Sequence, residues 1–173
     1  IITPWNFPLA IPAWKIAPAL ICGNTVVFKP ASSTPTAAVL FTQVFEEAGL
    51  PPGVLNLVTG PGSAVGSTLV ESPDVKGISF TGSTEVGTGV YVHGARGLKK
   101  VQCEMGGKNA VIVLDDADLD KAMGGILQGA FGSTGQRCTA TSRAIVEEPL
   151  YDEFMEQLID RTRRLKIGDG LDP

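Results

Sequence analysis

The stretch VKGISFTGSTEVG at residues 75–87 runs from an apolar segment through a glycine-containing turn into the start of a helix. Its pattern predicts a strand over residues 75–80 and a helix over residues 84–95. A helix that follows a strand in this way usually returns the chain to a neighbouring parallel strand. This stretch therefore predicts a βαβ unit.

The rest of the chain repeats this alternation. Strands are predicted at residues 1–3, 25–29, 54–58, 101–104, 110–114 and 143–147, and helices at residues 9–21, 35–48, 63–71, 119–131 and 151–165. Helices of about 10–15 residues between strands indicate a parallel sheet with helices on both faces. We therefore expect an α/β fold with a doubly wound, mostly parallel sheet. The glycine pair Gly106 and Gly107 marks the expected boundary between residues 1–106 and the start of a second α/β domain at residues 107–173.

The composition is that of an ordinary globular protein. The chain has 173 residues, of which 43% are hydrophobic and 18% charged, and a net charge of −4 with a sequence pI near 5.0. An acidic chain offers no electrostatic footprint for nucleic acid or for an anionic membrane. The most apolar run, residues 9–22, is too short to cross a bilayer and contains Lys15. We therefore expect neither a nucleic-acid nor a membrane partner.

Two features of the sequence concern its cellular compartment and whether it is part of a longer protein. Its three cysteines are an odd number, and their spacings fit neither a disulfide framework nor a zinc site, which favours a cytoplasmic protein. The sequence opens on a predicted strand, has its first methionine at Met105, and stops in a predicted loop. These ends indicate an internal piece of a longer protein.

The turns that follow the strands are the expected ligand sites, because ligands of open α/β sheets bind at the carboxyl ends of the strands. Residues 60–66 follow a strand and begin a helix, but their glycine spacing is one residue longer than the dinucleotide fingerprint. Residues 80–87 offer backbone N–H groups and a helix N-terminus to a phosphate, without the lysine of a P-loop. Each turn is either an anion site or a plain tight connection, and Lys29 is either a ligand contact or a solvated residue at the end of its strand.

One thiol lies in a setting that suits catalysis. The stretch GSTGQRCTA, residues 132–140, places Cys138 in a glycine-containing turn beside Arg137. The thiolate is the form that attacks a carbonyl carbon, and a fixed positive charge nearby favours it. Cys138 is therefore a candidate nucleophile, and a small buried apolar residue is the alternative.

A base for this nucleophile is expected to be a carboxylate, because the only histidine, His93, falls inside the predicted helix 84–95. Glu104 ends a strand just before the glycine pair. A partly buried carboxyl at such a position can act as a general base. A surface glutamate is the alternative.

A cluster of acidic residues resembles the start of a calcium loop, namely Asp116, Asp118 and Asp120. Lys121 and Leu127 stand where that loop needs a glycine and a glutamate. Capping of the following helix explains these carboxylates better, and no metal site is expected.

Five motifs occur together in a fixed order. They are PWNFP at residues 4–8, KPA at 29–31, FTGSTEVG at 80–87, EMGGK at 104–108 and GQRC at 135–138. In this order and at these spacings the whole chain resembles the aldehyde dehydrogenase superfamily, whose NAD(P)-dependent enzymes oxidise aldehydes to carboxylic acids. The resemblance implies part of a Rossmann-like NAD(P)-binding domain at residues 1–106 and the start of the catalytic domain at residues 107–173. It also implies that the strand that builds the oligomer, a homodimer or homotetramer, lies outside this chain.

The resemblance assigns roles to individual residues. Cys138 is the nucleophile that forms a thiohemiacetal and then a thioester with a small-molecule aldehyde, Glu104 is the general base, and Asn6 stabilises the oxyanion together with the Cys138 N–H. The residues implied to contact NAD or NADP are Thr3, Pro4, Trp5, Lys29, Ser32, Gly62, Gly66, Phe80, Thr81, Gly82, Ser83, Val86, Gly87, Met105 and Gly106.

Three questions stay open in the sequence. A relative that passes the acyl group to coenzyme A, and a catalytically incomplete folding or interaction module, are alternatives to the aldehyde dehydrogenase. Arg137 either pairs with the distal carboxylate of an acidic semialdehyde or has a structural or thiolate-tuning role. Ser32 stands where the family commonly has an acidic residue that repels a 2′-phosphate, so NADP is expected to be tolerated or preferred; the alternative is that Ser32 is a turn residue and NAD binds best.

Overall fold

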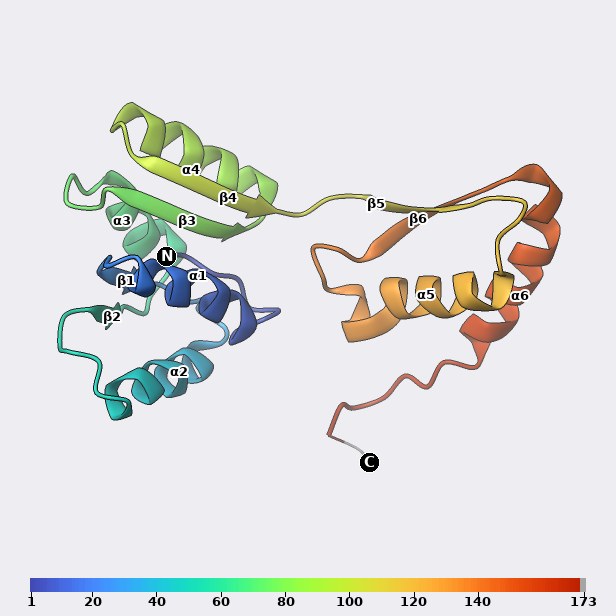
Figure 1. Ribbon diagram of the computed structural model, residues 1–173, viewed down its shortest axis with the longest axis horizontal. Helices are drawn as coiled ribbons and strands as arrows, with labels where there is room; N and C mark the ends of the chain where they lie inside the picture. The colour runs from blue at the N-terminus through green and yellow to red at the C-terminus, as the bar shows by residue number, and fades with distance from the viewer. Residues whose placement is uncertain (172–173) are drawn as a thin grey trace. The chain divides into compact units, whose positions relative to one another are not determined.

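The computed structural model describes residues 1–171 of the chain. The chain divides into two compact units, Ile1–Gly106 and Gly107–Pro173, each with its own apolar core (Figure 1). The passage from one unit to the other falls at the glycine pair. That residues 1–106 bind NAD(P) and that residues 107–173 begin the catalytic domain stay predictions.

The first unit is built on parallel strands. β1 (Val26–Phe28) pairs with β2 (Leu55–Leu57), and β3 (Gly77–Gly82) pairs with β4 (Lys100–Met105), both in parallel. Residues 1–3 lie between β1 and β3, because Ile2 bridges in parallel to Lys29 and to Phe80. The Thr3 N–H donates to the Lys29 carbonyl at 3.1 Å, and the Ile2 N–H donates to the Ser79 carbonyl at 2.9 Å. The strands therefore lie side by side in the order β2, β1, residues 1–3, β3, β4, and all of them are parallel. The chain adds β1 and β2 on one side of residues 1–3 and then β3 and β4 on the other, as in a doubly wound sheet.

Helices cover both faces of this sheet (Figure 1). They are α1 (Ala10–Ile21), α2 (Pro35–Glu47), the short π-type turn η1 (Gly62–Gly66), α3 (Ser67–Glu71) and α4 (Thr84–Arg96). One core cluster contains Ile16, Phe28 and Ala38, and the other contains Val70, Phe80 and Val90. Ile1 packs against the first cluster and Ile2 against the second. Since successive side chains of a strand point to opposite faces, the two clusters lie on opposite faces of the sheet.

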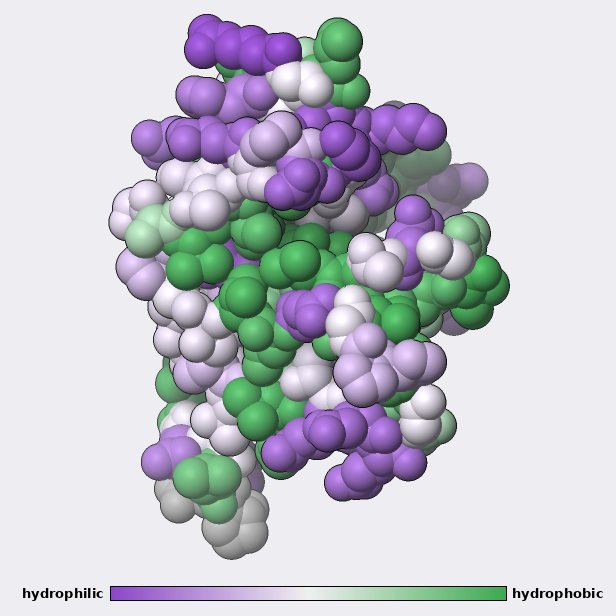
Figure 2. All heavy atoms as spheres, turned by 90° about the vertical axis from the view of Figure 1, so that its left-hand side faces the viewer, coloured by the Kyte–Doolittle hydropathy of each residue, from purple (hydrophilic) through white to green (hydrophobic). Residues whose placement is uncertain are grey.

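The surface of the first unit is of mixed character. Figure 2 shows apolar side chains gathered in the middle of this view, with polar side chains around them. The outer side of α1 is also apolar, since Trp14 is 70% and Ile21 86% exposed. None of the helices within residues 1–171 has the length and the apolar character needed to cross a bilayer.

Within residues 107–171, the second unit contains one parallel strand pair and two helices of 13 residues each. β5 (Asn109–Val113) is followed by α5 (Leu119–Phe131), the 3₁₀ turn η2 (Gly132–Gly135), β6 (Thr141–Val146), the 3₁₀ turn η3 (Glu148–Leu150) and α6 (Tyr151–Arg163). β5 and β6 are parallel, with an irregular register between Asn109 and Ala110. The core contains Val113, Met123, Ile126 and Phe154.

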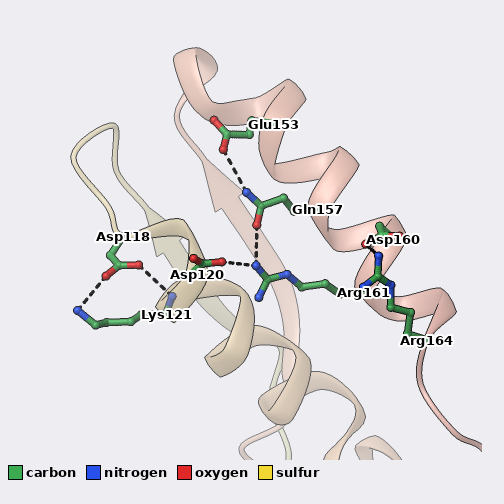
Figure 3. Close-up of polar contacts among 8 residues, drawn as sticks. All are labelled: Asp118, Asp120, Lys121, Glu153, Gln157, Asp160, Arg161 and Arg164. Atoms are coloured by element: carbon green, nitrogen blue, oxygen red, sulfur yellow. Dashed lines mark hydrogen bonds and ion pairs between the residues drawn. The ribbon is translucent and has the colours of Figure 1, made fainter.

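One ion pair joins the two helices of this unit, and further polar contacts lie within each helix (Figure 3). Arg161 on α6 pairs with Asp120 on α5 and donates to the Gln157 side chain at 3.0 Å. Asp118 accepts from the Lys121 N–H at 3.1 Å, so it caps α5. The prediction that helix capping explains this carboxylate is therefore confirmed.

Some predicted elements differ in the structure. The helix expected at residues 63–71 is split into η1 and the five-residue α3, with Gly66 at the junction, and glycine is disfavoured in a helix interior because it loses more backbone entropy than other residues. Residues 1–3 form single bridges rather than a longer strand. Thr34 occupies the cap position of α2, but its side chain makes no capping hydrogen bond.

The contact between α4 and the sheet depends on a glycine. A Cβ at Gly94 would lie 2.4 Å from Cγ2 of Val101, and a β-branched side chain has little freedom to move away. Gly94→Ala is therefore expected to lower the free energy of unfolding by about 1–3 kcal/mol through overpacking. Gly89→Ala on the same helix is the control, because a Cβ at Gly89 would have no neighbouring atom within 4 Å. Urea unfolding should show a loss for the first variant and a small gain for the second, and equal midpoints would contradict this packing.

Candidate active site

The sequence motifs of the first unit meet at one edge of its sheet. Lys29 follows β1, Thr81 ends β3, and Glu104 ends β4. The register places Thr81 opposite Glu104, and Ile2 bridges to both Lys29 and Phe80. The carboxyl ends of all these strands therefore lie side by side at the point where the strand order reverses. This is the position at which doubly wound sheets bind dinucleotides.

A cavity of about 450 Å³ opens at this edge on the face covered by α3 and α4. Lys29 is 4% exposed and forms part of its wall, and its Nζ donates to the Pro30 carbonyl at 2.9 Å. Burial lowers the pKa of Lys29. Five residues of the predicted cofactor set line this one cavity, namely Lys29, Gly62, Gly66, Phe80 and Val86.

The turn after β3 is shaped by glycines that could not be replaced without movement. A Cβ at Gly82 would lie 2.5 Å from the Phe80 ring, and a Cβ at Gly87 would lie 2.5 Å from Sδ of Met105. Ser83 caps α4 by accepting from the Val86 N–H at 3.3 Å. The backbone of this turn therefore packs closely against the Phe80 and Met105 side chains.

Two buried hydroxyls lie on the opposite face of the same edge. Thr3 is 4% and Thr81 8% exposed, and neither Oγ1 atom has a hydrogen-bond partner within residues 1–171. Each follows a residue of the Ile2–Phe80 bridge, so both side chains point to the same face. A buried hydroxyl without a partner costs about 1–3 kcal/mol. A polar ligand at this edge would remove that cost.

The remaining predicted residues of this edge are more open. Asn6 is half-buried and Trp5 is 47% exposed, and both follow Thr3 and Pro4 after the first strand. Ser32 is exposed, and its hydroxyl donates to the Gly60 carbonyl at 3.0 Å. Its proton is therefore already used to join the loops after β1 and β2, so it would have to leave this bond to reach a phosphate.

Glu104 is exposed in the first unit, so the expectation of a partly buried carboxyl is wrong here. The physical reason is its place on β4, an edge strand of the described sheet that α4 covers on one face. The neighbouring Met105 is also exposed, and a Cβ at Gly106 would meet open space.

Sequence reasoning missed Lys15, which it treated only as a break in an apolar run. Its Nζ donates to Oγ of Ser79 at 2.8 Å, Ser79 donates to Oε1 of Gln102 at 2.9 Å, and Gln102 donates to Oε1 of Glu104 at 3.5 Å. Burial lowers the pKa of Lys15, and the Glu104 carboxylate acts in the opposite direction. A lone cation beside Ile16 on the buried side of an apolar helix was the available signal.

The turn that carries Cys138 has an unusual backbone. Ser133, Thr134 and Gly135 all have positive φ, at 54°, 55° and 69°. A Cβ at Gly135 would lie 2.8 Å from the Ala130 carbonyl oxygen. Arg137 donates from Nε and from one terminal nitrogen to Oγ of Ser133, at 3.1 and 2.9 Å. These contacts support a structural role for Arg137 within the turn.

Cys138 itself is exposed, so the alternative of a small buried apolar residue is wrong for this thiol. Cys103 is half-buried, donates to the Gly87 carbonyl at 3.5 Å, and has a pKa raised by burial. Cys22 is exposed but follows α1 outside any comparable turn. Of these thiols, Cys138 alone combines exposure with a place shortly after the positive-φ residues 133–135.

His93 lies within α4, as predicted, and its Nδ1 is 2.8 Å from the Gly89 carbonyl. It lines the cavity beside Lys29. Within residues 1–171 no three His, Cys, Asp or Glu side chains gather closely enough to hold a metal ion.

Comparison with known proteins places these motifs in one family. The profile of the aldehyde dehydrogenase family matches residues 1–173, the whole chain. The chain belongs to this family. The resemblance and the α/β, Rossmann-like fold class inferred from the sequence are thereby confirmed.

Relatives of this aldehyde dehydrogenase chain are longer than it is. It is 55% identical over 171 residues to the alpha-ketoglutaric semialdehyde dehydrogenase of Bacillus subtilis. The alignment covers 99% of this chain and 35% of that protein. It is 49% identical to the 2,5-dioxopentanoate dehydrogenase of Saccharolobus solfataricus, covering 98% of this chain and 36% of that one. The chain therefore spans little more than a third of the length of these relatives.

Solved structures of the family superpose closely on the chain. A crystal structure of an NADP-dependent enzyme of E. coli is 48% identical with a TM-score of 0.96, covering 99% of this chain and 36% of that one. A betaine aldehyde dehydrogenase of Staphylococcus aureus in complex with NAD+ is 41% identical with a TM-score of 0.96, covering 99% of this chain and 34% of that one.

Proposed function

We propose that this chain is the cofactor-binding and thiol-bearing part of an NAD(P)-dependent dehydrogenase that oxidises a semialdehyde to a carboxylic acid. The observation that carries the proposal is the carboxyl edge of the first sheet. There the buried hydroxyls of Thr3 and Thr81 lack partners within residues 1–171, and glycines hold the backbone of the next turn against Phe80 and Met105. The exposed Cys138 turn of the second unit supplies the nucleophile.

The residues at this edge fit a dinucleotide. The cavity lined by Lys29, Gly66 and Val86 suits a flat base with its ribose, because its walls are largely apolar and Lys29 supplies a cation. The N-terminus of α4 offers N–H groups to the pyrophosphate beside Gly82. When bound, the nicotinamide ring supplies the hydride acceptor.

The proposed reaction uses three residues, Cys138, Asn6 and Glu104. The Cys138 thiolate adds to the aldehyde carbon, and the Asn6 amide and the Cys138 N–H stabilise the oxyanion, each such donor being worth ~3 kcal/mol. Loss of hydride from this adduct leaves a thioester on Cys138. Glu104 then removes a proton from water, which attacks the thioester, and the products are the carboxylic acid and the free thiol.

The proposed substrate class rests on the relatives. The proteins of Bacillus subtilis and Haloferax volcanii, at 55% and 52% identity, are both named for alpha-ketoglutarate semialdehyde. We propose an acidic semialdehyde of this kind. Arg137 is assigned to shaping the turn rather than to the substrate carboxylate, since its guanidinium is bonded to Ser133.

The function is tested with the full-length protein that contains this chain. Reduced cofactor is followed by its absorbance with a semialdehyde acid, with a neutral aldehyde of equal length, and with or without coenzyme A. We expect oxidation of the semialdehyde to the free acid without coenzyme A. Formation of an acyl-coenzyme A would favour the acylating alternative, and the absence of any reduction would favour the non-catalytic one.

The choice of nucleotide gives a separate prediction. A carboxylate at position 32 would repel a 2′-phosphate, so Ser32→Glu is expected to lower kcat/KM for NADP at least about tenfold relative to NAD, or about 1.4 kcal/mol. Ser33→Glu adds the same charge at the next exposed residue and is the control. Steady-state kinetics with both cofactors measures the ratio. An unchanged ratio in Ser32→Glu would mean that this residue does not face the 2′ position.

A further inference from the structure

Asn109, at the start of β5, contacts the backbone of the nucleophile's turn. Its side-chain amide donates to the Cys138 carbonyl at 2.8 Å and to the Ala140 carbonyl at 3.2 Å. One amide therefore spans both ends of the segment that follows the thiol. All of these residues lie in the second unit.

Two further side-chain hydrogen bonds join β6 to the start of β5 and to the residue before it. The Ser142 hydroxyl donates to the Asn109 carbonyl at 3.3 Å, and the Arg143 guanidinium donates to the Lys108 carbonyl at 2.6 Å. The parallel register shifts here, since Asn109 is opposite Thr141 and Ala110 is opposite Arg143. Side chains thus supply contacts where the regular strand ladder is interrupted. We refer to these four hydrogen bonds as the clasp.

One backbone hydrogen bond and the Asn109 bond of the clasp fix the backbone on the two sides of the nucleophile. The Arg137 carbonyl accepts from the Ala140 N–H at 3.1 Å, which holds the peptide plane before Cys138. The bond from Asn109 holds the peptide plane after it. Because peptide groups are planar, fixing both planes determines φ and ψ of Cys138. Those angles set the direction of its Cα–Cβ bond and of its N–H.

The turn needs such support from outside. Ser133 and Thr134 adopt left-handed conformations, which cost non-glycine residues roughly 1–3 kcal/mol each and persist only when the surroundings hold them. Among the described residues, the Arg137 guanidinium donates to the Ser133 hydroxyl, so two side chains of the turn itself help to stabilise it. Asn109 adds contacts from β5 to the segment that begins at Cys138.

We propose that Asn109 is a positioning residue for the nucleophilic step: its amide holds the Cys138 carbonyl so that the thiol and the Cys138 N–H keep the geometry of attack. The inference rests on the proposed function. A displacement of about 1 Å in a reacting group costs on the order of 100-fold in rate. Loss of the amide is therefore expected to slow the formation of the thioester more than it weakens binding of aldehyde or cofactor.

The test uses Asn109→Leu in the full-length protein, which keeps the size of the side chain, removes its donors and adds no charge. The rate of the first burst of reduced cofactor is measured by stopped flow across pH. We expect the burst to slow at least about tenfold, with the pH midpoint and the KM for cofactor unchanged. If this variant does not fold, Asn109→Ser, which is too short to span both carbonyls, carries the same expectation.

Ser142→Ala is the matched control, because it removes a hydrogen bond of the clasp that does not involve the Cys138 carbonyl. It should lower the unfolding midpoint without slowing the burst. A burst in Asn109→Leu within twofold of wild type, or an equal loss in Ser142→Ala, would overturn the positioning role. A wild-type protein that forms no reduced cofactor at all would instead contradict the proposed function. In that case, amide hydrogen exchange over residues 136–140 tests the inference. Exchange rates in Asn109→Leu equal to those of the wild type would overturn it.

Discussion

Cys138→Ala in the full-length protein is expected to reduce aldehyde oxidation below about a thousandth of the wild-type rate, because loss of the nucleophile removes the covalent route. Nucleotide binding should persist, since the residues that line the cavity beside Lys29 belong to the first unit. Turnover is measured by formation of reduced cofactor, and binding by calorimetry with the oxidised cofactor.

The control for this variant is Cys22→Ala, which removes another exposed thiol that lies outside a catalytic turn. Its activity should equal that of the wild type. If Cys138→Ala keeps more than about a thousandth of the wild-type activity, Cys138 is not the nucleophile. The half-buried Cys103 is not expected to replace it, because its thiol donates to the Gly87 carbonyl.

Glu104→Gln is expected to separate the two halves of the reaction. Hydride loss needs only the thiolate adduct, whereas hydrolysis of the thioester needs a base for water. A burst of reduced cofactor close to one equivalent per active site should appear, followed by turnover slowed about 100-fold or more. Stopped-flow absorbance measures both phases in one experiment.

Glu46→Gln, on the exposed side of α2, is the matched control and should behave like the wild type. Steady-state turnover of Glu104→Gln at the wild-type rate would remove this carboxylate from deacylation. Loss of the burst as well would show that it acts before the thioester forms.

Local pattern predicted the elements of the fold well. α5 begins and ends at Leu119 and Phe131, as its capping aspartate and apolar spacing indicate, and the β3-to-α4 turn follows from its glycines and serine cap. The strand order could not be read in this way. It depends on Ile2 pairing with Lys29 and Phe80, which are distant in sequence, and no local preference specifies such partners.

The candidate site shows the same division. The motifs identified the side chains because each lies in a turn at the end of a strand. The exposure of Glu104 depends on which helix covers an edge strand, and the left-handed Ser133 and Thr134 run against the preference of non-glycine residues. Asn109 was missed because its contact with Cys138 spans 29 positions and bridges an irregular register.

Direct capture of the acyl intermediate tests the central proposal most closely. Glu104→Gln in the full-length protein is mixed with the semialdehyde and oxidised cofactor, quenched in acid and analysed by intact mass and peptide mapping. The account predicts one added acyl group, on the peptide that contains Cys138, which hydroxylamine removes and which Cys138→Ala abolishes. An acyl group on Cys22 or Cys103, or reduced cofactor formed without any adduct, would contradict it.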